Sequence, residues 1–380
     1  GAHRAGFRPP AAPVPLVTSA APVRNGPRRT EAPMSARPAS FLTVLALLSF
    51  ATLPVPARAA DSPGEDRVKA LESKIDDLEL ELDQVRKSND DVLFWLRLSD
   101  VAEIDKVSIV GPPNPRGKER YGIANSRHPL RFAQYVFVPK GLDKAKRHPV
   151  VVLPHGGVHG DFTTYHVHIV REMLAKGWVV LAPDYRGSTG YGKDFLDAID
   201  YGGLEVDDVV AGLDWAVSEL PYVDGSRAAI AGWSHGGLIA LLAVMHHPEK
   251  WKACYAGVPV TDLVTRLGYH EQSYEDLFAA KNHIGKKVVE DVDEYRRRSP
   301  VFWVSKLKTP LLVHATTNDR DVNVLETENL VAALKAAGKP FEYRIYKDAP
   351  GGHSFNRIDT PFAKESRKEI WAFLEKHLGK

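Results

Sequence analysis

The amino-acid sequence predicts an α/β protein with a mostly parallel sheet that helices cover on both faces. Short, continuous apolar segments alternate with segments of helical periodicity from about residue 150 to the end of the chain. Strands that are apolar throughout are typical of parallel sheets, because both of their faces are buried. With 380 residues, 44% of them hydrophobic, the chain is long enough for one such domain and additional segments.

The expected elements can be assigned in chain order. Strands are expected at residues 106–110, 131–138, 150–153, 178–182, 228–231, 253–258, 311–314 and 342–346. Helices are expected at residues 162–176, 206–220, 237–246, 324–337 and 361–378. The first two strands are expected to form an antiparallel lead-in to the parallel sheet. In such sheets the chemistry lies at the carboxyl ends of the strands.

A heptad pattern precedes these elements and predicts a helix within residues 61–103. Apolar residues recur at steps of three and four, at the a and d positions Val68, Leu71, Ile75, Leu78, Leu82, Val85, Val92 and Leu96. Asn89 occupies an a position, where a single buried amide can fix the register of a parallel pair. Two arrangements stay open: a homo-oligomer formed through residues 68–96, or an amphipathic helix folded back on its own domain.

Residues 1–60 have the features of a leader and a secretory signal peptide. The first methionine is Met34, and Arg37 precedes an apolar run at residues 41–53 and the small-residue site Ala-Arg-Ala at residues 57–59. We therefore expect an exported protein, periplasmic or extracellular. The apolar run is too short to cross a bilayer. No membrane span is expected in the mature chain.

The charge balance argues against a nucleic-acid partner. Residues 1–60 hold seven basic residues and one acidic residue, so the remaining residues carry 43 basic and 47 acidic side chains, a formal net charge of −4. The sequence pI of about 8.4 thus belongs mainly to the leader. The single cysteine, Cys254, lies in an apolar run and is expected to be a buried small hydrophobic residue.

A nucleophilic serine is predicted where an apolar strand meets a helix. Residues 232–236 read Gly-Trp-Ser-His-Gly, a G-x-S-x-G motif, between the expected strand at 228–231 and the expected helix at 237–246. The glycines permit close backbone approach, so a sharp turn can point the Ser234 hydroxyl outward. The amide of His235 then faces the position where an oxyanion forms.

The partners of Ser234 follow from chain order. In α/β-hydrolase folds the catalytic residues come in the order Ser, then Asp or Glu, then His. His353, in a glycine-flanked loop after the last strand, fits the final position better than His314, which lies at a strand end before the acid. By chemistry alone, both Asp319 and Asp321 qualify as the acid.

Several ordered motifs resemble those of the prolyl oligopeptidase family of serine peptidases. The similarity covers roughly residues 145–380. It includes the nucleophile motif at residues 232–237, the segment Asp-Tyr-Arg-Gly-Ser-Thr-Gly-Tyr-Gly at residues 184–192, His-Gly-Gly at residues 155–157, and the acid motif Asp-x-x-Val at residues 319–322. The resemblance implies an α/β-hydrolase fold and a triad of Ser234, Asp319 and His353, because the family's acid lies three residues before a valine.

The resemblance also bears on the oxyanion site. His235 replaces the tyrosine that is common after the family's serine, which leaves its backbone amide available and changes the pocket wall. His155 stands where some members carry a tyrosine whose hydroxyl contacts the oxyanion. The second donor is therefore expected to be His155 itself or the amide of Gly156 or Gly157.

The resemblance implies a serine peptidase that cleaves short peptides through an acyl-enzyme. The family's larger members place a β-propeller ahead of the hydrolase domain, but here residues 104–380 form only the catalytic domain, so the propeller's gating role is not carried over. A carboxylesterase that acts on small esters is the alternative. A non-catalytic scaffold or binding protein is less compatible with a complete triad.

Arg186, in the glycine-rich segment at residues 184–192, is expected to be a buried structural ion-pair partner. Residues 261–300 form either part of the substrate wall, through Tyr269, Tyr274 and Phe278, or ordinary surface helix. No cofactor or metal is expected, because no cysteine or matching carboxylate pattern accompanies the clustered histidines His155, His159, His166 and His168.

Overall fold

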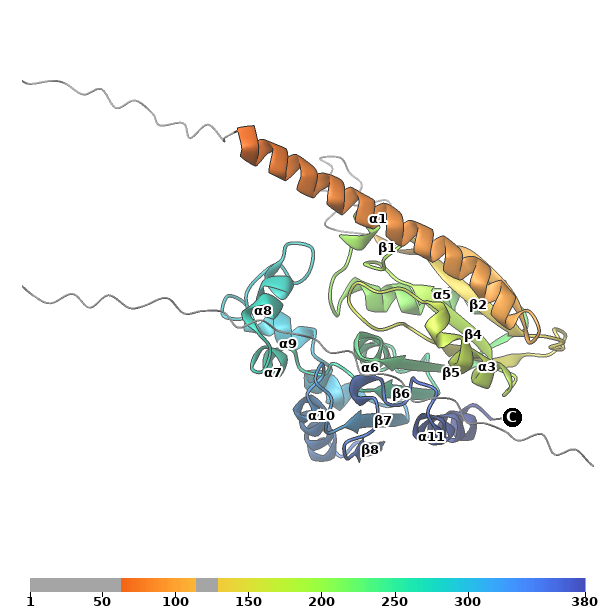
Figure 1. Ribbon diagram of the computed structural model, residues 1–380. Helices are drawn as coiled ribbons and strands as arrows, with labels where there is room; N and C mark the ends of the chain where they lie inside the picture. Colours follow the sequence, from red (N-terminus) through yellow and green to blue (C-terminus); the bar gives the residue numbers. More distant parts are fainter. Residues whose placement is uncertain (1–62, 114–128, 380) are drawn as a thin grey trace, which may run out of the picture. The chain divides into compact units, whose positions relative to one another are not determined.

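The computed structural model describes residues 63–113 and 129–379 (Figure 1). These residues belong to one compact unit, Asp61–Lys380. The predicted leader and signal peptide, residues 1–60, lie outside the described residues. The predicted boundary between residues 103 and 104 falls inside the first strand, because the N-terminal helix ends at Leu98 and that strand begins at Ala102.

The eight strands form one sheet, in the order β1-β2-β4-β3-β5-β6-β7-β8. β1 pairs antiparallel with β2, and β2 pairs antiparallel with β4, whereas β4, β3, β5, β6, β7 and β8 are parallel to one another. The mostly parallel sheet with an antiparallel lead-in is therefore confirmed. The strands are β1 (Ala102–Pro113), β2 (Pro129–Pro139), β3 (His148–Val152), β4 (Val179–Asp184), β5 (Val223–Trp233), β6 (Ala253–Gly257), β7 (Leu311–Thr316) and β8 (Glu342–Tyr346).

Helices connect the parallel strands. The α-helices are α1 (Pro63–Leu98), α3 (Val167–Leu174), α4 (Lys193–Leu196), α5 (Leu204–Glu219), α6 (His235–His246), α7 (Leu263–Leu267), α8 (Gln272–Ala279), α9 (Val292–Arg297), α10 (Val324–Ala336) and α11 (Pro361–Leu378). Short 3-10 turns are η2 (Thr164–His166), η3 (Pro300–Lys306) and η4 (Gly352–Ser354). Within the described ranges, no helix is both long enough and apolar enough to cross a membrane.

Two hydrophobic cores lie on opposite faces of the sheet, and β5 contributes to both. Ala228 and Ile230 face one core, with α5, α6 and α10 packed over it. Ala229 and Ala231 face the other core, with α3, α11 and the C-terminal end of α1. Alternate residues of a strand point to opposite faces, so a strand between two cores must be apolar throughout. This burial explains the continuous apolar runs in the sequence.

The N-terminal helix contacts its own domain without using the predicted apolar stripe. Phe94 and Leu98 are buried near its C-terminal end, and the Phe94 ring packs 4.9 Å from Tyr135, between ring centroids. Lys87 is also buried, with Nζ 2.7 Å from an Asp184 carboxylate oxygen. By contrast, the a and d residues named above are 46% to 72% exposed. The helix is therefore folded back on its own domain, as the second arrangement has it, but residues from the side opposite the apolar stripe make the contact.

Arg186 has the structural role that the sequence predicts. It is fully buried, and its Nε and Nη2 lie 2.7 and 2.8 Å from the two carboxylate oxygens of Asp208 on α5. Nη2 also donates to the carbonyl of Pro112. The ion pair thus joins the end of β4 to α5 and to β1.

Cys254 is buried on β6, as the sequence predicts, and this burial raises the pKa of its thiol.

Candidate active site

Ser234 occupies a tight turn between β5 and α6. Its backbone has φ of 59° and ψ of −123°, a conformation that residues other than glycine rarely adopt. The neighbouring backbone leaves no room for side chains. A Cβ at Gly232 would lie 2.1 Å from the Gly236 carbonyl oxygen, and one at Gly236 would lie 2.3 Å from the Pro154 carbonyl oxygen. The glycines of the motif are therefore required by contact between backbone segments.

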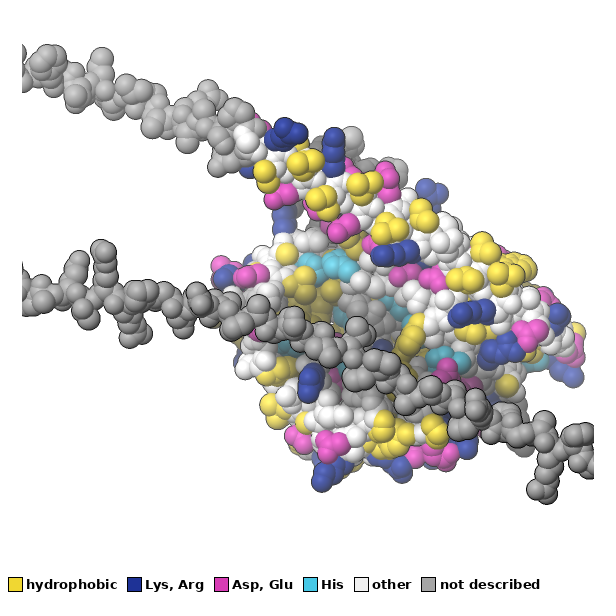
Figure 2. Space-filling view, in the orientation of Figure 1, with side chains coloured by type: hydrophobic (Ala, Val, Ile, Leu, Met, Phe, Trp, Pro, Cys, Tyr) yellow, Lys and Arg dark blue, Asp and Glu magenta, His cyan; other side chains and the backbone are white. Residues whose placement is uncertain are grey.

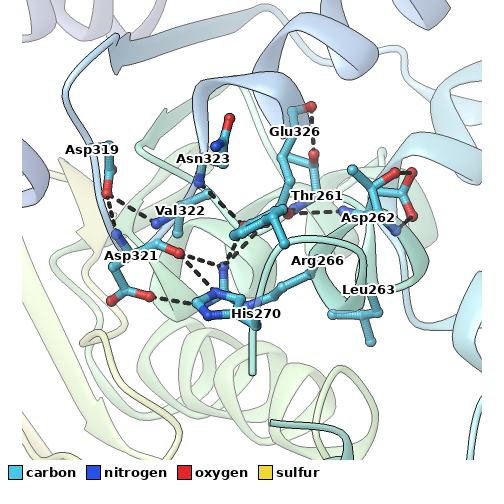
Figure 3. A network of polar contacts seen from close by, with 12 residues as sticks. Thr261, Asp262, Leu263, Arg266, His270, Asp319, Asp321, Val322, Asn323 and Glu326 are labelled. Carbon is cyan, nitrogen blue, oxygen red and sulfur yellow. Dashed lines mark hydrogen bonds and ion pairs between the residues drawn. The ribbon is translucent and has the colours of Figure 1, made fainter. Parts of the chain in front are cut away.

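His353 and Asp319 come together from loops that follow β8 and β7. His353 Nδ1 lies 2.7 Å from Asp319 Oδ2 (Figure 3 shows Asp319 and the loop that carries it). The other carboxylate oxygen of Asp319 accepts hydrogen bonds of 2.9 Å from the amides of Asp321 and Val322. The carboxylate is thus held by its own loop in the orientation that contacts the imidazole.

Asp321 lies on the other side of the imidazole. Its Oδ1 accepts a 2.7 Å hydrogen bond from Arg266 Nη2, and its Oδ2 is 3.6 Å from His353 Nε2. Burial alone would raise the pKa of the Asp321 carboxyl, but His353 and Arg266 lower it below its ordinary value. The two candidate acids therefore contact different nitrogens: Asp319 binds Nδ1, and Asp321 is anchored to Arg266 near Nε2.

Arg266, on α7, belongs to the inserted segment, residues 261–300 between β6 and β7. It connects this segment to the loop after β7 that carries Asp319 and Asp321 (Figure 3). Its Nη1 lies 3.1 Å from Glu326 and 3.1 Å from the carbonyl oxygen of Asp321. Glu326 in turn accepts hydrogen bonds from the amides of Thr261 and Asp262. Arg266 is almost fully buried, so these acceptors satisfy a charge that would otherwise be costly. The role of Arg266 is not predictable from the sequence, because an arginine among tyrosines and carboxylates has no distinctive spacing.

The aromatic residues of the inserted segment have structural contacts. The hydroxyls of Tyr269 and Tyr274 both hydrogen-bond to Arg266. Phe278 is fully buried, with its ring against Tyr201 at a centroid distance of 4.6 Å. Phe278 therefore belongs to the core beneath the segment and does not line an open surface.

The His-Gly-Gly loop after β3 brings backbone against Ser234. A Cβ at Gly156 would lie 3.5 Å from the Ser234 Cβ. The imidazole of His155 has other contacts, because it stacks on Tyr185 and its Nε2 lies 2.9 Å from Ser188 Oγ. Burial lowers the pKa of His155, so its ring is neutral near pH 7. Of the residues predicted to supply the second oxyanion donor, it is thus Gly156 whose backbone lies beside Ser234.

His235 directs its side chain into the core and leaves only its backbone at the turn. Its Nε2 lies 3.4 Å from Glu205, and its ring packs on Tyr201 at a centroid distance of 4.9 Å. Burial alone would raise the pKa of Glu205, but His235 and the amide of Gly202 lower it to about 2. His235 begins α6 directly after Ser234, so its amide lies at the positive end of that helix.

Comparison with known proteins agrees with this fold and motif set. A sequence model described as the prolyl oligopeptidase family matches residues 165–380. The chain is 26% identical over 296 residues to the acylamino-acid-releasing enzyme of Homo sapiens, covering 76% of this chain and 39% of that protein. It is 28% identical over 244 residues to the uncharacterized peptidase YuxL of Bacillus subtilis, covering 63% of this chain and 36% of that protein.

A solved structure shows the same fold. Pyrococcus horikoshii acylaminoacyl peptidase superposes with a TM-score of 0.61 at 23% identity, covering 74% of this chain and 42% of that one. The chain thus spans about two fifths of the length of these relatives. The sheet has the α/β-hydrolase arrangement, and the family match covers more than half of the chain. This chain belongs to the prolyl oligopeptidase family of serine peptidases.

Proposed function

We propose that this protein cleaves short peptides through an acyl-enzyme, with Ser234 as nucleophile, His353 as general base and Asp319 as the acid that orients the imidazole. The observation that carries the proposal is the 2.7 Å contact between His353 Nδ1 and Asp319 Oδ2. The loops that carry these residues follow β8 and β7, and the turn at Ser234 follows β5 in the same parallel sheet. Family membership supports the proposal, because Ser, His and Asp form the most widespread catalytic triad of serine peptidases.

The reaction would proceed in two halves. His353 Nε2 takes the proton from Ser234 Oγ as the oxygen attacks the substrate carbonyl carbon, and Asp319 stabilises the imidazolium that forms. The backbone amides of His235 and Gly156 donate to the oxyanion. His353 then gives its proton to the departing amine, which leaves an acyl-Ser234 ester. Water, activated by the same imidazole, hydrolyses that ester and regenerates the serine.

The substrate is proposed to be a short peptide, with N-acylated peptides included because two relatives carry acylamino-acid or acylaminoacyl peptidase names. The described residues contain a single eight-stranded sheet and no β-propeller, so substrate choice is proposed to rest on the surface around Ser234. Each additional apolar contact changes selectivity by only about 1 to 3 kcal/mol. Small esters, which have better leaving groups, are proposed as secondary substrates. A carboxylesterase remains the second candidate.

We also propose that the protein self-associates through the a/d stripe of α1, defined as Val68, Leu71, Ile75, Leu78, Leu82, Val85, Asn89, Val92 and Leu96. The apolar members are exposed along a stretch of about 40 Å, at 1.5 Å per helical residue. Figure 2 shows hydrophobic side chains following the length of this helix. The partner is proposed to be a second copy of the same helix, because a heptad repeat is complementary to another heptad repeat.

Charge placement beside the stripe favours a parallel, in-register pair. In that arrangement each g residue faces the e residue five positions later in the other copy. Three of the four pairs along the stripe join opposite charges: Arg67 with Glu72, Lys74 with Glu79, and Glu81 with Arg86. The fourth, Ser88 with Leu93, is uncharged. Asn89 would also face its own copy only in this register. An antiparallel pair would place the Asn89 amide against apolar side chains.

The catalytic domain lies on the other side of the helix and leaves the stripe accessible. Lys87 and Phe94, which contact the domain, occupy f positions, directly opposite the a/d stripe. Asp90, at a b position, accepts a 2.7 Å hydrogen bond from the Thr164 hydroxyl. Two helices could therefore pair along the stripe while each catalytic domain stays on the outside of the pair.

The assignment of the nucleophile predicts the behaviour of one variant. Ser234→Ala should abolish labelling by a fluorophosphonate and lower peptide turnover by about 10⁴ to 10⁶, with little change in thermal unfolding temperature. Ser226→Ala, at an exposed serine on the same strand, is the matched control and should label normally. Persistent labelling of Ser234→Ala would contradict the assignment. Ester turnover with no peptide turnover would make carboxylesterase the better description.

Replacement of Asp319 and replacement of Asp321 should lower turnover to different extents. Asp319→Asn should lower turnover by about 10⁴, because an amide holds the imidazole in the wrong tautomer. Asp321→Asn should have a much smaller effect, because Asp321 does not contact Nδ1. Steady-state kinetics with one peptide substrate compare the two variants directly. If Asp321→Asn proved the more damaging change, Asp321 would be the orienting acid.

Export is proposed from the signal-like pattern at residues 34–60. Mature protein should begin near Ala60 or Asp61, and deletion of residues 34–60 should retain the protein inside the cell. N-terminal sequencing of protein recovered from the periplasm or medium identifies the first residue of the mature protein. Exported material that begins upstream of Phe41 would rule out a cleaved signal.

Self-association should depend on the stripe. Sedimentation at micromolar concentration should show a dimer, and Leu78→Asp should make it monomeric without changing fluorophosphonate labelling. Ser73→Asp, on the opposite side of the same helix, is the control and should stay dimeric. Leu82→Cys should form a disulfide between copies under oxidising conditions if the pair is parallel and in register. A monomeric wild-type protein would contradict the proposal.

A further inference from the structure

Arg357 differs from the other buried arginines. It lies four residues after His353 and is 8% exposed. In the described part of the chain, each of the other buried arginines pairs with a carboxylate: Arg186 with Asp208, Arg266 with Glu326 and Asp321, Arg298 with Asp200 and Glu294, and Arg367 with Glu172. Arg357 has no such pair there. Its Nη2 donates 2.6 Å to the carbonyl of His353, and its Nε has no partner among the described residues.

An unpaired buried guanidinium is costly, because burial removes the hydration of the charge without replacing it by a counter-charge. The effect is visible in the pKa of Arg357, which burial lowers from its usual value in spite of the more distant carboxylates of Asp319 and Asp321. A carboxylate bound from outside the chain would supply the missing counter-charge. Guanidinium groups bind carboxylates with good directionality, through paired N–H donors.

Arg357 lines a hollow of about 360 Å³ between the end of α1, the η2 turn and the loop before α11. That volume suits a small ligand. The charged residues at its wall are Arg357, Arg97 and Asp359, which together carry a net positive charge. His168 also lines the hollow, and burial lowers its pKa, so it is neutral near pH 7. The hollow thus favours one negative charge.

Arg357, at the wall of the hollow, also lies close to the candidate nucleophile. A Cβ at Gly156 would lie 3.5 Å from the Ser234 Cβ and 3.8 Å from Arg357 Nη1, so the serine and the guanidinium flank the same glycine. The Nη2 contact with the His353 carbonyl places the guanidinium next to the residue that protonates the leaving amine. The group beside Arg357 would then belong to the leaving part of the substrate.

We propose that Arg357 binds the free α-carboxylate of the amino acid or dipeptide that leaves when the peptide bond is cleaved. This inference rests on the proposed peptidase function and names the substrate class for that site: short peptides that end one or two residues after the cleaved bond. Such recognition would make the length of the peptide substrate a determinant of activity. A longer peptide carries its carboxylate too far away to reach the guanidinium, and a C-terminal amide carries no negative charge.

The test compares two substrates that differ only at this group, acetyl-Phe-Ala with a free carboxylate and the same peptide with a C-terminal amide. Wild-type protein should prefer the carboxylate by about 10-fold to 100-fold in kcat/KM, the range for hydrogen bonds between charged groups. In Arg357→Gln the ratio should fall to about one, whereas Arg357→Lys should retain part of it. Arg131→Gln removes an exposed guanidinium on β2, outside the hollow, and should keep the wild-type ratio.

The outcomes separate this inference from the proposed function. Equal turnover of both peptides by the wild-type protein would overturn the role of Arg357 and leave the peptidase function intact. Turnover of a small ester with neither peptide cleaved would overturn both. Fluorophosphonate labelling of each variant reports whether the site is folded. If Arg357→Gln fails to label, the comparison of the two substrates on wild type and Arg357→Lys still decides the question.

Discussion

The contact between backbone segments at the end of β5 is the constraint on which the rest of the site depends. Gly232, Gly236 and Pro154 approach so closely that no side chain fits between them, and Ser234 is held in a conformation that its backbone would not adopt alone. Such a conformation costs about 1 to 3 kcal/mol and persists only where the surroundings enforce it. Here the enforcing structure is β5 and α6, which are buried between two hydrophobic cores. The core therefore positions the hydroxyl.

The geometry of the loops that carry Asp319 and His353 depends on polar contacts, whereas the turn at Ser234 depends on apolar burial. Asp319 is oriented by two amides of its own loop, and the adjacent Asp321 is held by Arg266 from the inserted segment. Arg266 also binds Glu326 at the start of α10, so one buried cation links the insertion to the loop after β7. The insertion between β6 and β7 thus supports the geometry around His353, in addition to any contact it makes with substrate. Arg357 differs from these paired charges, because it has no carboxylate partner among the described residues.

The N-terminal helix α1 has two different sides. One side, through Lys87 and Phe94, is built into the catalytic domain, where the Lys87 ammonium contacts Asp184 at the end of β4. The apolar residues of the a/d stripe, on the other side, stay exposed among the residues that the structure describes. An exposed apolar stripe of this length is unusual on a monomer, and this is the reason for the proposal that the stripe binds a second copy.

The sequence alone determined the fold class, the strand and helix order, and the position of the nucleophile turn, because these follow from short-range patterns: apolar runs, helical periodicity and glycines beside a serine. It also indicated His353 and two acids, and the family resemblance favoured Asp319. Only the tertiary structure decided which acid contacts Nδ1, since a two-residue difference in one loop depends on hydrogen bonds made within the folded loop. The imidazole of His155 and the ring of Phe278 face other residues for a similar reason: partners distant in sequence, Ser188 and Tyr201, determine where they point. Arg266 and Arg357 were not foreseen, because whether a buried arginine has a carboxylate partner depends on which loops meet in space.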